Sequence, residues 1–236
     1  MPPRADRNGA TAGADDSGMS PAARVVSVNV GLPRGVPWRG RTVQTAIFKE
    51  PVAGRVAVRR DNLAGDRRGD LRVHGGRAKA VYAYPAEHYA AWEAELGTPL
   101  SWAAFGENLT VAGLPLEDEM HVGDRLAVGS ALLAVTQPRL PCFKLGIRFG
   151  RRDVIARMLA SGRTGFYLAI VEEGDVAAGD EIAIVERHPA AVPVSAITRT
   201  FGEDRADPDA LERLAALEPL PAEWRTWARQ QLAKAG

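Results

Sequence analysis

The segment Thr136–Leu145 contains the residue best suited to chemistry, Cys142. Two prolines in this segment restrict the backbone and remove N–H donors, so we expect the loop to present the thiol in one fixed direction. Arg139 and Lys144 flank the cysteine, and nearby cations favour the thiolate, the form that ligates metals and attacks electrophiles. A cysteine that packs as a small buried apolar residue is the alternative interpretation.

A second candidate segment runs from Gly69 to Tyr82. His74 directly precedes Gly75 and Gly76, where the backbone can approach a ligand closely. Arg72 adds positive charge suited to a phosphate or another anion. A glycine-containing hairpin with solvated basic residues and a hydrogen-bonded structural histidine is an equally good reading. We predict no zinc site, because there is no second cysteine and the other histidines lack paired ligand spacing.

Two shorter polar segments are weaker candidates. Asn108 lies in the run Phe105–Thr110, where its side chain either contacts a heterocycle or stabilises a loop. Arg163 lies in the run Ser161–Tyr167 and is a candidate anion contact. The sequence has no G-x-G-x-x-G or Walker-type nucleotide loop, no H-E-x-x-H and no G-x-S-x-G motif.

Composition excludes several classes of protein. The 236 residues are 46% hydrophobic, and 30 basic against 29 acidic residues give a formal net charge of +1. A nucleic-acid binder usually has a basic excess, so none is expected here. No apolar stretch approaches the roughly 18 residues of a membrane span, so we expect a soluble protein that does not bind membranes. A single cysteine is easiest to keep reduced in the cytoplasm, which is the predicted location.

Short apolar runs separated by Gly, Pro and Asp predict a mainly β fold, an all-β barrel or sandwich. Helical insertions are expected at Pro85–Leu96 and Val154–Leu159. The predicted strands are Arg24–Val30, Thr42–Lys49, Val56–Arg60, Ala80–Tyr84, Leu109–Val111, Arg125–Val128, Ala131–Thr136, Phe166–Glu172 and Glu181–Arg187.

Three regions follow from this pattern. Residues 1–22 lack bulky apolar side chains in number and are predicted to be a disordered tail. Residues 23–192 form the β domain. Residues 193–236 favour three helices, near 194–201, 208–216 and 221–235, with Asp207 as an N-cap. Because these helices are too short to enclose a large core, we expect their apolar face to pack on the β domain.

Taken in order, the motifs resemble the MOSC-domain family (molybdenum-cofactor sulfurase C-terminal domain), specifically its YiiM-type members. The helical tail resembles the three-helix domain of that subtype. The matching pieces are Gly69-Asp70 with His74-Gly75-Gly76, Tyr84 through Trp92, Phe105-Gly106-Glu107-Asn108-Leu109, Gln137-Pro138-Arg139 with Pro141-Cys142-Lys144-Leu145, and Gly162-Arg163-Gly165-Tyr167.

The resemblance implies a MOSC β-barrel that binds the molybdenum cofactor, molybdopterin with molybdenum, with Cys142 as the metal ligand and a catalytic residue. His74 would be a second catalytic residue, as proton donor or as a hydrogen-bond anchor. The implied reaction is the reductive detoxification of N-hydroxylated compounds such as 6-hydroxylaminopurine to amines, with electrons from a separate reductase. The implied cofactor-binding residues are Arg72, Gly75, Gly76, Asn108, Gln137, Arg139, Lys144 and Arg163.

The sequence departs from the family pattern at Ala78, where an Asp is common, and at Ala169, where an Arg is common. These changes affect either substrate contacts or a structural ion pair. Two other functions use the same cysteine: a sulfur carrier or sulfur-transfer protein, with a persulfide on Cys142, and a molybdopterin storage protein.

Overall fold

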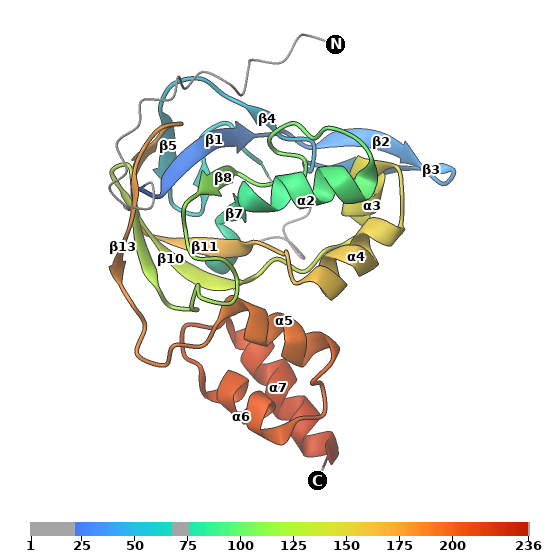
Figure 1. Ribbon diagram of the computed structural model, residues 1–236, viewed down its shortest axis with the longest axis vertical. Coiled ribbons are helices and arrows are strands. Elements are labelled where there is room, and N and C mark those ends of the chain that lie inside the picture. Colours follow the sequence, from blue (N-terminus) through green and yellow to red (C-terminus); the bar gives the residue numbers. More distant parts are fainter. Residues whose placement is uncertain (1–21, 68–75, 236) are drawn as a thin grey trace.

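The computed structural model describes residues 22–67 and 76–235 and is drawn in Figure 1. Its elements are β1 (Arg24–Val30), β2 (Arg34–Trp38), β3 (Arg41–Thr45), β4 (Glu50–Pro51), β5 (Val56–Arg59), β6 (Asn62–Leu63), the 3-10 helix η1 (Arg77–Lys79), β7 (Val81–Pro85), α2 (Glu87–Leu96), β8 (Leu109–Ala112), β9 (Arg125–Val128), β10 (Ala131–Pro138), α3 (Phe143–Phe149), α4 (Asp153–Ser161), β11 (Phe166–Glu172), β12 (Gly174–Val176), β13 (Ile182–Glu186), α5 (Val194–Gly202), α6 (Pro208–Ala216) and α7 (Ala222–Ala235).

A mixed sheet of eight strands forms the body of the molecule, in the order β13-β9-β10-β11-β7-β8-β1-β4. Its neighbouring strands are antiparallel except for β7 and β8, which are parallel. A parallel pair needs a crossover connection, and α2 lies within the segment that provides it. Two smaller sheets, β12-β5-β6 and the hairpin β2-β3, complete the described strands. The predicted mainly β class with helical insertions and C-terminal helices is confirmed.

The ladders of the described strands do not close into a barrel, because β13 and β4 remain at the two edges of the large sheet. The chain nevertheless curls back on itself. An isolated antiparallel bridge joins Arg24 to Glu181, and the N–H of Val25 donates to the carbonyl of Asp180 at 2.9 Å. The start of β1 therefore lies against the segment that leads into β13, as the curvature of the sheet in Figure 1 shows.

The three C-terminal helices pack against the end of the sheet, below it in Figure 1. Asp207 caps α6 as expected, because its carboxylate accepts from the N–H groups of Asp209 and Ala210. Leu211 and Leu214 are buried in the same apolar cluster as the strands of the sheet. The expected packing of this helical face on the β domain is therefore confirmed.

A second buried cluster, rich in aromatic residues, packs the helices α2, α3 and α4 against the sheet. Tyr84, Trp92 and Phe105 are buried there, and the rings of Tyr84 and Phe105 stack with centroids 4.3 Å apart. Leu145 of α3 and Met158 of α4 pack into the same cluster. This cluster fixes α3, and with it the residue that precedes α3, Cys142.

Candidate functional site

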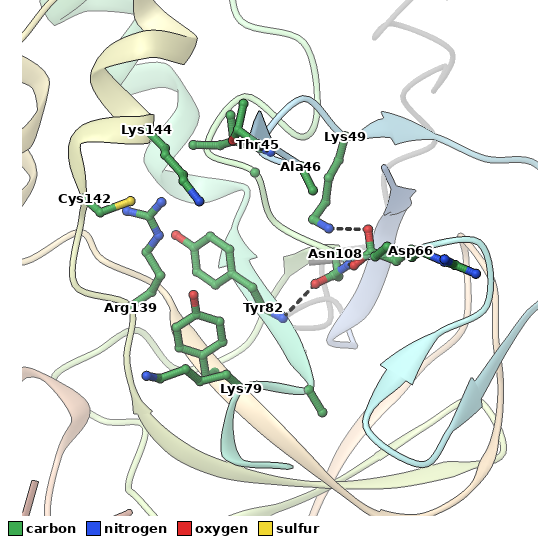
Figure 2. A pocket seen from close by; sticks show the side chains of 15 residues that line it. Thr45, Ala46, Lys49, Asp66, Lys79, Tyr82, Asn108, Arg139, Cys142 and Lys144 are labelled. Atoms are coloured by element: carbon green, nitrogen blue, oxygen red, sulfur yellow. Dashed lines mark hydrogen bonds and ion pairs between the residues drawn. The ribbon is translucent and has the colours of Figure 1, made fainter. Parts of the chain in front are cut away.

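A pocket opens between the start of α3, the segment after β3 and the strand β7, and Figure 2 shows it from close by. It contains about 610 Å³ of empty space, including its opening to solvent. The lining residues are Thr45, Ala46, Ile47, Lys49, Asp66, Arg67, Lys79, Ala80, Tyr82, Gly106, Asn108, Arg139, Cys142, Lys144 and Tyr167.

Cys142 is a free, partly exposed cysteine directly before α3. Strand β10 ends at Pro138, and the following loop brings the thiol to the pocket in extended conformation (φ −121°, ψ 171°). Its carbonyl accepts from the N–H of Leu145 at 2.9 Å, which fixes the loop to the first turn of the helix. The alternative of a buried structural cysteine is therefore not what the structure shows.

Arg139 is the most unusual charge in the pocket. Its side chain is only 6% exposed, and its Nη1 has no hydrogen-bond partner. The guanidinium carbon lies 5.6 Å from the centre of the Tyr82 ring, and Figure 2 shows the group beside the sulfur of Cys142. No ion pair with a carboxylate is found for it in the described part of the chain. A buried cation without an anion is costly, so this group favours a negatively charged ligand.

Arg139 keeps its charge in this environment. Burial lowers its pKa, but its interactions with Tyr82, Tyr167 and Cys142 outweigh that effect and leave the pKa above its usual value. Tyr82 cannot supply a counter-charge at neutral pH, because burial raises the pKa of its phenol well above 10. Its hydroxyl instead donates to the carbonyl of Thr164 at 2.8 Å.

A buried ion pair forms the opposite wall of the pocket. Lys49 Nζ contacts Asp66 Oδ1, and both side chains are less than 10% exposed. Asn108 Nδ2 donates to Asp66 Oδ2 at 3.0 Å, and Asn108 Oδ1 accepts from the N–H of Tyr82 at 3.2 Å. The predicted ligand contact Asn108 thus lies at the pocket, but its amide holds the pocket wall together. Lys49 and Asp66 neutralise each other, so the positive charge of the pocket comes from its other lining cations, Arg67, Lys79, Arg139 and Lys144.

Four of the predicted site residues come together here: Asn108, Arg139, Cys142 and Lys144. Arg72, His74 and Gly75 lie outside the described residues. Gly76 directly precedes η1 with φ 98°, a conformation that favours glycine, and so leads the chain into Lys79 at the pocket.

Gln137 and Arg163 lie elsewhere in the described structure. Gln137 is buried, and its Oε1 accepts from the indole N–H of Trp224 on α7. Arg163 pairs with Glu95 and lies over the ring of Trp92, at the cleft between α4 and α5. Sequence reasoning missed Lys49, Asp66 and Tyr82, since charged and aromatic residues at these positions have no signal of their own in a single sequence.

The two residues that depart from the family pattern, Ala78 and Ala169, both lie next to β10. The carbonyl of Ala78 accepts from the hydroxyl of Thr136 at 2.6 Å, and Ala169 pairs with Ala134 between β11 and β10.

Within the described ranges, no three His, Cys, Asp or Glu side chains gather in a way that holds a metal ion. No helix in those ranges has the length and apolar character required to cross a membrane.

Comparisons with known proteins agree with these observations. The MOSC domain matches residues 70–183, and the YiiM-like 3-alpha helix domain matches residues 192–235. The chain is 40% identical over 201 residues to the uncharacterized protein YflK of Bacillus subtilis (strain 168), which covers 85% of this chain and 90% of that protein. The crystal structure of YiiM from Geobacillus stearothermophilus superposes with a TM-score of 0.76 at 35% identity, over 89% of this chain and 99% of that one.

A further relative is a protein named "Reductase" from Gibberella moniliformis (strain M3125 / FGSC 7600). It is 32% identical over 152 residues, which make up 63% of this chain but only 27% of that protein.

Proposed function

Because the chain belongs to the MOSC-domain family and has the YiiM-type helical domain, we propose that it binds the molybdenum cofactor through Cys142 and reduces N-hydroxylated compounds to amines. The observation that carries this proposal is the buried guanidinium of Arg139, whose Nη1 has no hydrogen-bond partner, beside the partly exposed Cys142. A soft sulfur ligand and a fixed positive charge thus lie together in one pocket.

The residues of the pocket fit the molybdenum cofactor. Molybdopterin is an anionic ligand, and Arg139 Nη1 is a buried donor without a partner, as an anionic ligand requires. Cys142 supplies a thiolate of the kind that soft metals prefer, and Lys144 adds a second cation at the pocket. We therefore assign Cys142 as the metal ligand and Arg139 and Lys144 as contacts to the anionic parts of the cofactor or substrate.

The reaction removes the hydroxyl oxygen of an N–OH group as water and consumes two electrons and two protons. When bound, the cofactor supplies the two-electron redox chemistry. The chain supplies the sulfur of Cys142, positive charge from Arg139 and Lys144, and the buried ring of Tyr82 in the pocket wall. His74, outside the described residues, is the proposed proton donor, since the reference pKa of histidine lies near neutrality.

We propose that the electrons come from a separate reductase in the cytoplasm. The chain has one cysteine and therefore cannot itself hold an iron–sulfur cluster with cysteine ligands. The relative named "Reductase" supports redox chemistry for the segment that it shares with this chain, which is 27% of that protein.

Turnover of 6-hydroxylaminopurine tests the proposal. Protein from a host that makes the cofactor is mixed with an artificial reductant, and adenine formation is followed by chromatography. Adenine formation that disappears in Cys142→Ser is the expected result. Cofactor-loaded protein that reduces no N-hydroxylated compound would indicate the storage function instead.

The partly exposed thiol among cations also suits a sulfur carrier, because these cations would stabilise a persulfide anion on Cys142. Sulfur that is released by cyanide from wild-type protein, and not from Cys142→Ser, would favour this second function, provided that the wild-type protein contains no molybdenum.

A further inference from the structure

Two guanidinium groups lie against one aromatic ring next to the pocket. The carbon Cζ of Arg34 is 4.2 Å from the centre of the Phe48 ring, and Cζ of Arg148 is 5.0 Å from the same centre. Arg34 is exposed and Arg148 is half-buried. Neither side chain forms a hydrogen bond or an ion pair with any residue in the described ranges. Like charges are therefore held together without a carboxylate between them.

Holding these groups together has an electrostatic cost. Burial lowers the pKa of Arg148, the carboxylate of Glu107 opposes this effect, and the neighbouring Arg34 lowers the pKa further, so that the pKa lies below its usual value. The nearby carboxylate of Glu50 is exposed and makes no ion pair with either arginine in the described part of the chain. Cation–π contact with Phe48 holds both guanidinium groups in place but does not neutralise them. An anion between them would remove the repulsion.

This cluster is continuous with the rim of the pocket. Arg34 pairs with Thr45 across the β2-β3 hairpin, and Thr45 lines the pocket. Phe48 lies between two further lining residues of the pocket, Ile47 and Lys49. Arg148 follows Lys144 by four positions on α3, so the two side chains lie on one face of the helix. At about 1.5 Å per residue, Arg148 is about 9 Å along the helix from Cys142.

We propose that Arg34 and Arg148 form a subsite for a phosphate monoester, whose remaining part extends along α3 into the pocket toward Cys142. The planar guanidinium of arginine binds phosphate oxygens in a bidentate manner, and two such groups suit a dianionic phosphate. We consider two candidate ligands with such a phosphate, an N-hydroxylated nucleoside monophosphate and the pterin of the cofactor. A substrate of the first kind rests on the proposed function, whereas phosphate binding itself does not.

The first experiment measures phosphate binding without any redox reaction. Full-length protein from a host that lacks the cofactor is titrated with inorganic phosphate and with adenosine monophosphate in a calorimeter. Wild type is compared with Arg34→Gln, Arg148→Gln and the control Arg213→Gln, an exposed arginine on α6. We expect each rim variant to weaken binding about tenfold or more, as loss of a hydrogen bond to a charged group does, and the control to match wild type.

Wild-type protein that binds neither compound, or rim variants that bind both as tightly as wild type, would overturn the proposal. Thermal unfolding of each variant provides the check on folding. Arg148→Lys, which keeps the charge but loses the bidentate geometry, should bind with intermediate affinity.

A second experiment identifies the source of the phosphate. Pterin content is measured by fluorescence in each variant after expression in a cofactor-competent host. A lower pterin content in Arg148→Gln assigns the subsite to the cofactor. Unchanged content with a raised KM for the N-hydroxylated nucleoside monophosphate, but not for the free base, assigns it to the substrate. If pterin content and both KM values all remain unchanged, no phosphate occupies the subsite and the proposal fails. Loaded protein that reduces neither compound would refute the proposed function but would leave the calorimetric result standing.

Discussion

The indole N–H of Trp224 on α7 donates to Oε1 of Gln137 on β10, two residues before Arg139. Both side chains are buried, so the bond joins the helical domain to the strand that leads into the pocket. Lys79, a lining residue of the pocket, also lies 3.7 Å from Glu223 of α7. The helical domain therefore contacts both the strand that leads into the pocket and one of the residues that line it.

Trp224→Phe should lower the free energy of unfolding by about 1–3 kcal/mol, because the buried amide oxygen of Gln137 loses its partner. Trp227→Phe is the matched control, since Trp227 is only partly buried and lies outside this bond. Urea unfolding measures both. Equal losses in the two variants would show that the bond contributes no more than ring packing.

Much of the fold was predictable from the sequence, because periodicity and turn residues reflect local preferences. The strand Arg24–Val30 and the helix Pro208–Ala216 with its Asp207 cap lie where the patterns indicate. The strand expected at Thr42–Lys49 ends at Thr45, and the hairpin partner Arg34–Trp38 was missed, since a Gly and a Pro interrupt its pattern.

The helix α3 was also missed, for a physical reason that involves Gly146. Glycine weakens a helix prediction, yet here a Cβ would lie only 3.2 Å from the carbonyl oxygen of Arg151, so the tight packing favours the small residue. The pocket wall shows the same limit. Lys49 and Asp66 are 17 residues apart, and only the folded chain shows that they form a buried pair. Cys142, Arg139 and Lys144 could be identified from the sequence because they lie close together in one short segment.

Arg139→Met should separate stability from ligand binding. Removing a buried charge without a partner should leave the cofactor-free protein as stable as wild type, or more stable by about 1–2 kcal/mol. Cofactor content should fall, because the anionic ligand loses its buried donor. Calorimetry of the cofactor-free protein and pterin fluorescence of the loaded protein measure the two effects. A large loss of stability would show that Arg139 is structural.

Glu107 should make stability depend on pH. It is fully buried, and burial raises the pKa of its carboxyl above 4.5 in the folded state. The folded protein therefore holds this proton more tightly than the unfolded chain does. The resulting stabilisation is fully present below the unfolded pKa and is lost as the pH rises through the folded pKa.

Glu107→Gln removes this titration and should abolish that part of the pH dependence. It should also lower stability by about 1–3 kcal/mol at all pH values, since the carboxylate accepts from the N–H groups of Ala103 and Phe105 and an amide can accept on one side only. Unfolding curves from pH 4 to pH 8 compare the two proteins, a window that begins just below the ordinary pKa of a glutamate carboxyl, about 4.3. Parallel stability profiles would contradict the assignment.

The central claim is that Cys142 is the protein ligand of a molybdenum cofactor. Molybdenum by elemental analysis, together with pterin fluorescence, in wild type and Cys142→Ser from a cofactor-competent host tests it most directly. We predict stoichiometric molybdenum and pterin in wild type and strongly reduced molybdenum in Cys142→Ser. The variant should unfold at the temperature of cofactor-free wild type, since the side chain is partly exposed. Equal molybdenum in both proteins, or wild type that remains free of metal and pterin, would contradict it.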